Sequence, residues 1–128
     1  MLDKLSTETI ANIFDALPIE CSFVDKDDIV MYYSKGEARI FRRTPSVIGM
    51  KVQNCHPQKS VHKVQQILDD FKAGKRDVAQ FWINLKGRMI LIRYFPVRDK
   101  SGSYIGCLEV TQDITDIKTI EGEKRLLD

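Results

Sequence analysis

The pattern of hydrophobic and polar positions along the chain predicts a sheet of antiparallel strands interrupted by helices. Runs rich in β-branched and aromatic residues, bounded by turn residues, indicate strands. They predict five strands, at Glu20–Asp25, Ile29–Ser34, Asp77–Leu85, Arg88–Arg98 and Tyr104–Gln112. Helices separate the first two strands from the last three, without strict alternation of strand and helix. The pattern therefore favours the α+β class with an antiparallel sheet.

Two amphipathic helices are predicted, one at the N-terminus and one in the middle of the chain. In Leu5–Leu17, Ser6 can cap the first turn, and Pro18 stops the helix. The longer helix is expected to follow a cap at Ser60 and to end before Gly74. Its apolar stripe consists of Val61, Val64, Ile67, Leu68 and Phe71.

Shorter pieces fill the rest of the chain. Helical turns are predicted at Gly36–Phe41 and Thr44–Ile48, and an irregular loop at Lys51–Lys59. A chain of 128 residues suits one hydrophobic core. We expect a flanking N-terminal helix in residues 1–18, one domain in residues 19–115 and a tail in residues 116–128.

Composition and charge narrow the class of protein. The chain is 43% hydrophobic and 30% charged, as in ordinary globular domains, and its 20 basic and 18 acidic residues are mixed. This mixing argues against a nucleic-acid binder, which gathers its basic residues into a patch. The nearest approach to a patch is Lys35, Arg39, Arg42 and Arg43, which a solvated helix face explains. No apolar run approaches the roughly 20 residues that span a bilayer, so we expect no membrane contact.

Cysteine and histidine usage argues against a metal site and against catalysis. Cys21, Cys55 and Cys107 are odd in number and far apart, which favours reduced thiols and a cytoplasmic location over zinc or disulfides. Cys55 and His56 are adjacent, so their side chains diverge and form no nucleophile–base pair. Neither a Ser/His/Asp set, nor a glycine-rich phosphate loop, nor a metalloprotease motif is present. We therefore expect no enzyme activity.

Five short motifs follow one another along nearly the whole chain. They are Phe14-Asp-Ala-Leu-Pro18, Phe23-Val-Asp25, Val47-Ile-Gly49, His56-Pro57 and Gly106 followed by Asp113-Ile-Thr115. In this order the motifs resemble the PAS family of sensory domains. The resemblance implies a half-barrel sheet with short helices and one longer helix on one face, which enclose a cavity for a small molecule or cofactor. It also implies dimerisation and transmission of a signal to an attached domain.

Two stretches are similar to one subgroup of this family. Val52–Pro57 and Leu108–Thr115 look closest to the PAS modules found with hemerythrin-like domains in bacteria and archaea. That likeness implies a covalently linked partner domain on the N-terminal side, outside this chain.

Seven residues are candidates for contact with a ligand. They are Cys55, His56, Val64, Leu68, Trp82, Glu109 and Thr111. His56 is either an axial ligand to haem iron, the one metal site considered, or a loop histidine that bonds the backbone. Asn54-Cys55 superficially resembles the flavin photosensor pair. However, the residues that follow differ and Thr111 stands where that branch has glutamine, so flavin is disfavoured.

The sequence does not decide which face of the last strand lines the cavity. Alternation places Cys107, Glu109 and Thr111 on one side. If that side faces the cavity, Glu109 and Thr111 are polar anchors for a ligand; if it faces outward, Glu109 pairs with Arg93 or Lys86. Trp82 lines the pocket, forms a dimer surface or packs in the core.

The sequence thus favours a non-catalytic sensory or regulatory domain that binds a small molecule between the long helix and the sheet. A small metabolite is the favoured ligand, and haem comes second. The alternative is a ligand-free interaction module that forms a homodimer through the N-terminal helix and the outer sheet face. In that alternative its own side chains fill the cavity, such as Phe41, Met50, Trp82 and Phe95.

Overall fold

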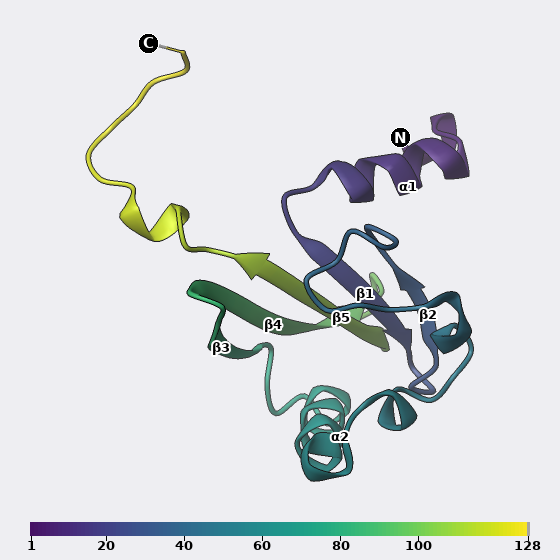
Figure 1. Ribbon diagram of the computed structural model, residues 1–128. Coiled ribbons are helices and arrows are strands. Elements are labelled where there is room, and N and C mark those ends of the chain that lie inside the picture. The colour runs from purple at the N-terminus through teal and green to yellow at the C-terminus, as the bar shows by residue number, and fades with distance from the viewer. Residues whose placement is uncertain (128) are drawn as a thin grey trace.

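The computed structural model of the protein describes residues 1–127. Five strands form one antiparallel sheet in the order β2-β1-β5-β4-β3 (Figure 1). The strands are β1 (Glu20–Asp25), β2 (Val30–Tyr33), β3 (Ala79–Leu85), β4 (Arg88–Arg98) and β5 (Tyr104–Asp113). The predicted α+β class with a five-stranded antiparallel sheet is confirmed.

The centre of the sheet joins the two ends of the domain, because β5 returns to pair with β1. Their approach is close at Gly106, where an added Cβ would lie 2.3 Å from the carbonyl oxygen of Val24 and 2.4 Å from the ring of Phe23. Any larger residue would push the two strands apart there. Glycine is therefore required at this position by packing, whatever its backbone angles.

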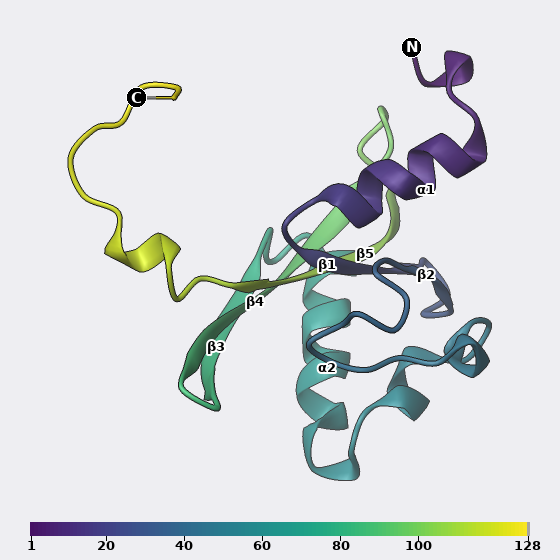
Figure 2. The same cartoon turned by 45° about the horizontal axis from the view of Figure 1, so that its top comes forward.

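Two α-helices lie on opposite faces of the sheet, α1 (Thr7–Ala16) on the outer face and α2 (Gln58–Lys72) on the inner face (Figure 2). Short 3₁₀ turns complete the fold at Leu2–Lys4, Pro45–Val47, Val52–Cys55 and Ile117–Thr119.

The ends of both α-helices can be compared with the sequence-based expectation. The Ser6 hydroxyl accepts a hydrogen bond from the Thr9 amide at 3.0 Å, so the predicted cap of α1 is confirmed. The predicted cap of α2 is wrong. That helix begins at Gln58 with Pro57 as its cap residue, and Ser60 lies inside the first turn, where its hydroxyl donates to the Pro57 carbonyl. Gly74 follows the end of α2 with a φ of +72°, as its position predicts.

The helix predicted at Gly36–Phe41 does not form. Lys35 and Gly36 both adopt positive φ angles, which redirect the chain out of a helical path. The segment then runs as an irregular strap, held because the Arg39 guanidinium donates to the carbonyl oxygens of Ser34 and Phe41. Long-range bonding of one arginine overrides the local helical pattern here.

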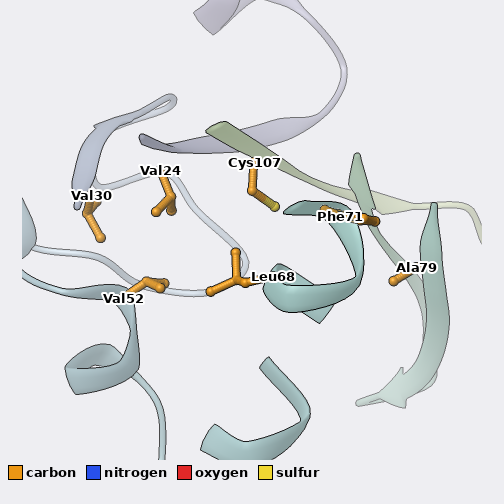
Figure 3. Packing of buried hydrophobic residues seen from close by; sticks show 7 residues of the cluster. All are labelled: Val24, Val30, Val52, Leu68, Phe71, Ala79 and Cys107. Atoms are coloured by element: carbon orange, nitrogen blue, oxygen red, sulfur yellow. The ribbon is translucent and has the colours of Figure 1, made fainter. Parts of the chain in front are cut away.

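The hydrophobic core lies between the sheet and the C-terminal half of α2. Its buried members are Val24, Val30, Val52, Leu68, Phe71, Ala79 and Cys107 (Figure 3). Phe71 has no exposed surface and Leu68 is 3% exposed, whereas Val64 and Ile67, nearer the start of α2, are only partly buried. The helix is thus anchored to the sheet at one end.

The chain leaves the sheet through the Asp113-Ile-Thr115 motif. The Ile114 amide donates to the Met89 carbonyl, and the Met89 amide donates to the Thr115 hydroxyl at 2.8 Å. These bonds tie the end of β5 to the start of β4. Beyond them the tail runs away from the sheet, with Ile117 and Ile120 exposed (Figure 1). None of the helices formed by residues 1–127 is long and apolar enough to cross a membrane.

Candidate ligand-binding site

A cleft of ≈530 Å³ opens between the first half of α2 and strands β3 and β4. Its lining comes from the loop before α2, from α2 itself and from strands β3 and β4. The lining includes His56, Lys63, Val64, Ile67, Phe81 and Tyr94. Most of this surface is apolar, with a few polar groups, which is the usual composition of a small-molecule site.

A smaller cavity of ≈20 Å³ adjoins the cleft and is lined by residues of β1 and β5 as well as α2. His56, Val64, Ile67 and Tyr94 line both spaces, so the cavity forms the inner end of the cleft. Leu68 and Glu109 line only the inner part. Its volume is about that needed for one water molecule. A ligand larger than water therefore requires the outer cleft.

His56 is held by the backbone of the turn before α2. Its Nδ1 lies 3.0 Å from the carbonyl oxygen of Val52. Because a carbonyl oxygen only accepts, Nδ1 carries a proton, and in the neutral ring Nε2 is the acceptor. The residue thus makes the backbone bond expected of a loop histidine and still lines the cleft with an acceptor. Ligating histidines have the same arrangement, in which the second ring nitrogen donates to a carbonyl.

Glu109 faces the helical side of the sheet, which resolves the open question about β5. Its carboxylate lies 3.5 Å from the Nη2 of Arg43, and the two side chains are 12% and 13% exposed. Tyr94 is the β4 partner of Glu109 in the sheet register. Burial, with the neighbouring Glu109 carboxylate, raises the pKa of Tyr94. Its hydroxyl therefore keeps its proton, which it donates to the Glu109 carboxylate.

A second buried ion pair lies further along the same face. Glu20 and Arg39 approach to 3.0 Å, with side chains that are 4% and 1% exposed. Burial raises the pKa of Glu20 while the Arg39 charge opposes the change, and burial lowers the pKa of Arg39 while Glu20 opposes it. The interpretation of Arg39 and Arg43 as a solvated face is therefore wrong. The sequence contained one signal for this buried pair. Glu20 is the first residue of its strand and lies on the same face as Ser22 and Val24.

Six of the seven candidate residues separate into three groups. His56, Val64, Leu68 and Glu109 line the cleft and its inner cavity. Cys55 packs against the core, with its thiol donating to the Lys51 carbonyl at 3.7 Å. Thr111 is buried and lines a separate pocket at the start of β1 and the end of β5.

The prediction that Trp82 lines the cavity is wrong. Trp82 is 60% exposed, and its neighbour Phe81 lines the cleft instead, because successive residues of β3 point to opposite faces. Trp82 and Met50, both named as residues that could fill the cavity, are exposed. Alternation along β3 was visible in the sequence, but the face that the cleft occupies was not.

No group of three or more His, Cys, Asp or Glu side chains within residues 1–127 is arranged to hold a metal ion. The cleft therefore presents hydrogen-bonding and apolar surface, with His56 as its one imidazole.

Comparison with known proteins agrees with this architecture. A family model described as PAS domain matches residues 10–115. The chain belongs to the PAS domain family. PAS domains are generally non-catalytic sensory modules, and membership supports a sensory or regulatory role for this chain.

Solved structures similar to this PAS domain include the C-terminal domain of a Streptococcus mutans protein, with 36% identity, a TM-score of 0.85 and 91% of each chain covered. The PAS domain of BvgS from Bordetella pertussis has 20% identity and a TM-score of 0.64, with 88% of each chain covered. VqmA, which occurs in Vibrio cholerae, was solved bound to DPO. It has 20% identity and a TM-score of 0.61, over 88% of this chain and 59% of that one. The last two share the fold alone. No curated protein matches the sequence.

Proposed function

We propose that this PAS domain binds a small, mainly apolar metabolite in the cleft between α2 and the sheet. The observation that carries the proposal is the ≈530 Å³ cleft itself, with Val64, Ile67 and Phe81 as apolar walls. His56 and Tyr94 line both the cleft and its inner cavity, and the neutral His56 ring supplies a hydrogen-bond acceptor. VqmA, which shares this fold, is described as bound to DPO, and this supports a ligand for the present domain too.

The anchoring of α2 at one end indicates how ligand binding could change the structure of the domain. Phe71 fixes the end of the helix in the core, while its first half borders the cleft. A ligand that contacts both Val64 and Phe81 stabilises one distance between α2 and β3. It changes the output only if its affinity differs between two arrangements of the domain or dimer.

Binding of the apolar dye anilinonaphthalene sulfonate, followed by fluorescence, tests the cleft. In Val64→Trp the indole fills the space, so we expect dye binding to be lost. Gln66→Trp adds the same side chain at an exposed position of α2, and this control should bind as the wild type does. Equal dye binding by all three proteins would remove the cleft from consideration, and native mass spectrometry of the purified protein would then reveal any ligand bound elsewhere.

Haem is the second candidate ligand, favoured by the single observation that His56 has its Nδ1 bonded to a carbonyl and its Nε2 free. When bound, haem would supply a redox-active, gas-binding iron, and His56 would hold it as an axial ligand. A titration with haem checks this by absorption. His56→Ala should abolish the Soret band of the complex, while the exposed His62→Ala should not. Haem uptake unaltered by His56→Ala would end the candidacy of this residue.

A homodimer through α1 and the outer sheet face is the alternative function, and it is compatible with ligand binding. Helix α1 has no buried residue, although its stripe includes Ile13, which is 48% exposed, and Phe14, which is 38% exposed. Burial of this stripe against a second copy would recover hydrophobic free energy. Ile13→Asp with Phe14→Asp should give monomers in sedimentation, and Asn12→Asp should not. A dimer that persists in the double variant would exclude α1 from the interface.

The domain is further proposed to act in the cytoplasm as part of a longer protein, with a hemerythrin-like partner domain on its N-terminal side. Free thiols at Cys21, Cys55 and Cys107 agree with a reducing compartment. Co-purification of iron with the full-length natural protein, and its loss from the isolated PAS domain, would support this organisation.

A further inference from the structure

The two edges of the sheet differ in how they are protected from pairing with a further strand. At one edge, β2 is only four residues long, and its pairing with β1 shifts register between Phe23 and Val24. A loop also covers this edge, because the Val30 amide donates to the Met50 carbonyl and the Gly49 amide donates to the Val30 carbonyl. Short length, irregular pairing and a covering loop are usual ways of blocking an edge strand.

The opposite edge strand, β3, has none of these features. It is seven residues long, pairs with β4 without a shift of register, and ends the strand order, with no strand of residues 1–127 on its outer side. Its sequence from Ala79 to Leu85 contains no charged residue, proline or glycine. Phe81 is 42% exposed and Trp82 is 60% exposed. A regular, uncharged and apolar edge strand is a ready template for pairing with another strand.

The unpaired backbone groups of β3 can be identified from the strand beside it. In β4, the amide and the carbonyl of Met89 both bond to the end of β5. Because the direction of these groups alternates along an antiparallel strand, the residues on either side of Met89 bond to β3 instead. Their partners are the odd-numbered residues of Ala79–Leu85. Gln80, Trp82 and Asn84 therefore direct their amides and carbonyls away from the sheet.

A second copy of β3 matches these outward groups in one antiparallel register. A twofold axis at Trp82 places the two copies of Trp82 opposite each other, and Gln80 opposite Asn84 of the other copy. All three outward-facing residues are then in hydrogen-bonded pairs. A shift of the axis by one residue would place one of them opposite Val78 or Lys86, which lie outside the strand.

Side chains on both faces gain apolar contact in this register. On the inner face, Phe81 lies opposite Ile83 of the other copy, and such aromatic and β-branched pairs stabilise antiparallel strands. On the outer face the two exposed Trp82 rings lie beside each other, so both lose contact with water.

The charges at the two ends of β3 are complementary in the same register. Asp77 precedes the strand and Lys86 follows it, and both are exposed. Antiparallel pairing centred on Trp82 brings Asp77 of one copy within one position of Lys86 of the other. Arg76 and Arg88, the nearest other charged side chains, already have carboxylate partners in their own chain. A second copy of this strand is therefore the occupant that the edge fits.

We propose that β3 is an interface through which two copies of the domain join edge to edge into one continuous sheet. Helix α1 lies over β1 and β2, at the other end of the sheet (Figure 2), so this pairing is separate from a dimer through α1. Phe81 lines the cleft as well as the interface. A ligand in the cleft would therefore influence the pairing, a consequence that alone rests on the function proposed above.

Amide hydrogen exchange of the wild-type protein tests the pairing. The amides of Gln80, Trp82 and Asn84 exchange quickly in an open edge and slowly in a paired one. Above the dissociation constant the monomer fraction falls with the square root of concentration, so a rise of about a hundredfold should slow these amides about tenfold. The amides of Phe81 and Ile83, already bonded to β4, should change much less. Absent protection, or protection independent of concentration, would overturn the proposal.

A pair of lysine substitutions identifies the edge responsible. Trp82→Lys places two like charges opposite each other at the axis and should abolish the concentration-dependent protection of Gln80 and Asn84. Met31→Lys adds the same charge at an exposed apolar position of β2, the other edge, and should behave as the wild type does. Slow exchange in the buried half of α2 reports that each variant is folded. Wild-type protection in folded Trp82→Lys would refute the interface.

Disulfide trapping tests the register. Opposite residues of a hydrogen-bonded pair have Cα atoms about 5.5 Å apart, which suits a disulfide, so Trp82→Cys should give a covalent dimer under mild oxidation. In Gln80→Cys the two thiols lie four residues apart along the strand, about 13 Å, and should not cross-link. Both variants keep the native thiols at Cys21, Cys55 and Cys107. Equal cross-linking of the two variants, or none in Trp82→Cys, would contradict the pairing.

Discussion

The two faces of the sheet carry helices of similar pattern and very different burial. On the inner face, α2 buries Phe71 completely and Leu68 to 3% exposure. On the outer face, α1 has no buried residue, and its Phe14 makes only a tilted ring contact with Tyr32, with centroids 5.8 Å apart. An amphipathic pattern shows that a helix needs an apolar surface to pack on, but not that the same chain supplies it.

The inner face is itself divided. Towards α2 it is apolar and includes the cleft, whereas towards the strap it carries the buried pairs Glu20–Arg39 and Arg43–Glu109. The two regions call for different kinds of stabilisation. Core residues contribute through buried apolar area, while the strap depends on a few strong polar contacts whose partners must all be present.

The largest loss of stability is expected from a substitution on the polar side of the inner face. Arg39→Ala removes the partner of Glu20 and also leaves the carbonyls of Ser34 and Phe41 without their donor. Loss of one partner from a buried ion pair costs about 3–5 kcal/mol, and the additional carbonyls favour the upper end of that range. Urea unfolding followed by circular dichroism measures the loss. A change below about 1 kcal/mol would show that the pair contributes little.

A double variant separates the charge from the packing. Glu20→Gln with Arg39→Met removes both charges while keeping similar volume, so no buried charge is left unpaired. We expect it to be less destabilised than Arg39→Ala, because replacement of a whole buried pair by uncharged groups is often nearly neutral. Equal destabilisation of the two proteins would mean that the hydrogen bonds of Arg39, which both variants lose, and not the unpaired charge of Glu20, account for the effect.

The next largest loss of stability is expected when one phenylalanine on each face of the sheet is replaced and the two variants are compared. Phe71→Ala leaves a cavity in the core and should lower the free energy of unfolding by about 3–4 kcal/mol. Phe14→Ala on α1 removes a side chain that is 38% exposed, so we expect a loss of about 1 kcal/mol or less. Equal losses, measured by urea unfolding of the monomeric protein, would contradict the difference between the two helices.

Features governed by local pattern could be predicted from the sequence. The five strands, both α-helices and the Ser6 cap depend on residue periodicity and on neighbours within one turn. His56 could be placed near the cavity because it directly precedes α2. The positions of Val64 and Leu68 followed from the apolar stripe of the same helix.

The rest depends on contacts between distant parts of the chain. Arg39 bonds backbone atoms of β1, 18 positions earlier, and no helical or strand period marks that contact. Alternation along β3 separates Phe81 from Trp82, but only the placement of α2 decides which of them meets the cleft. The contacts of Glu20 with Arg39 and Ile40 likewise follow from the path of the strap, which no local period marks.

A smaller effect concerns the cap of α1 on the outer face. Ser6→Ala removes the hydroxyl that accepts from the Thr9 amide and should weaken this helix by about 1 kcal/mol. Because α1 contributes little to the core, amide hydrogen exchange should accelerate in α1 and stay unchanged in α2. Ser60→Ala is the matched comparison, since Ser60 caps no helix and its hydroxyl only donates to the Pro57 carbonyl. Faster exchange throughout the domain would show that α1 is required by the whole fold.

The smallest effects on stability are expected from the titration of two carboxylates whose pKa values are shifted in opposite directions. Hydrogen bonds from Arg88 and Thr115 lower the pKa of Asp113 from 3.8 to about 2, whereas burial raises the pKa of Glu20 above 4.5. The stability contributed by Asp113 is therefore complete above its unfolded pKa and is lost as the pH falls through about 2. Glu20 has the opposite sign, because the folded state holds its proton more tightly, and stability decreases as the pH rises through its raised pKa.

Thermal unfolding midpoints between pH 2 and pH 7 test both signs at once. The difference between wild type and Asp113→Asn should grow as the pH rises from about 2 to about 4 and then stay constant. The difference between wild type and Glu20→Gln should decrease as the pH rises above about 4.5. Parallel curves for the two variants would mean that the buried Glu20 carboxylate of β1 and the half-buried Asp113 carboxylate at the end of β5 have similar environments, and the contrast between these regions would fail.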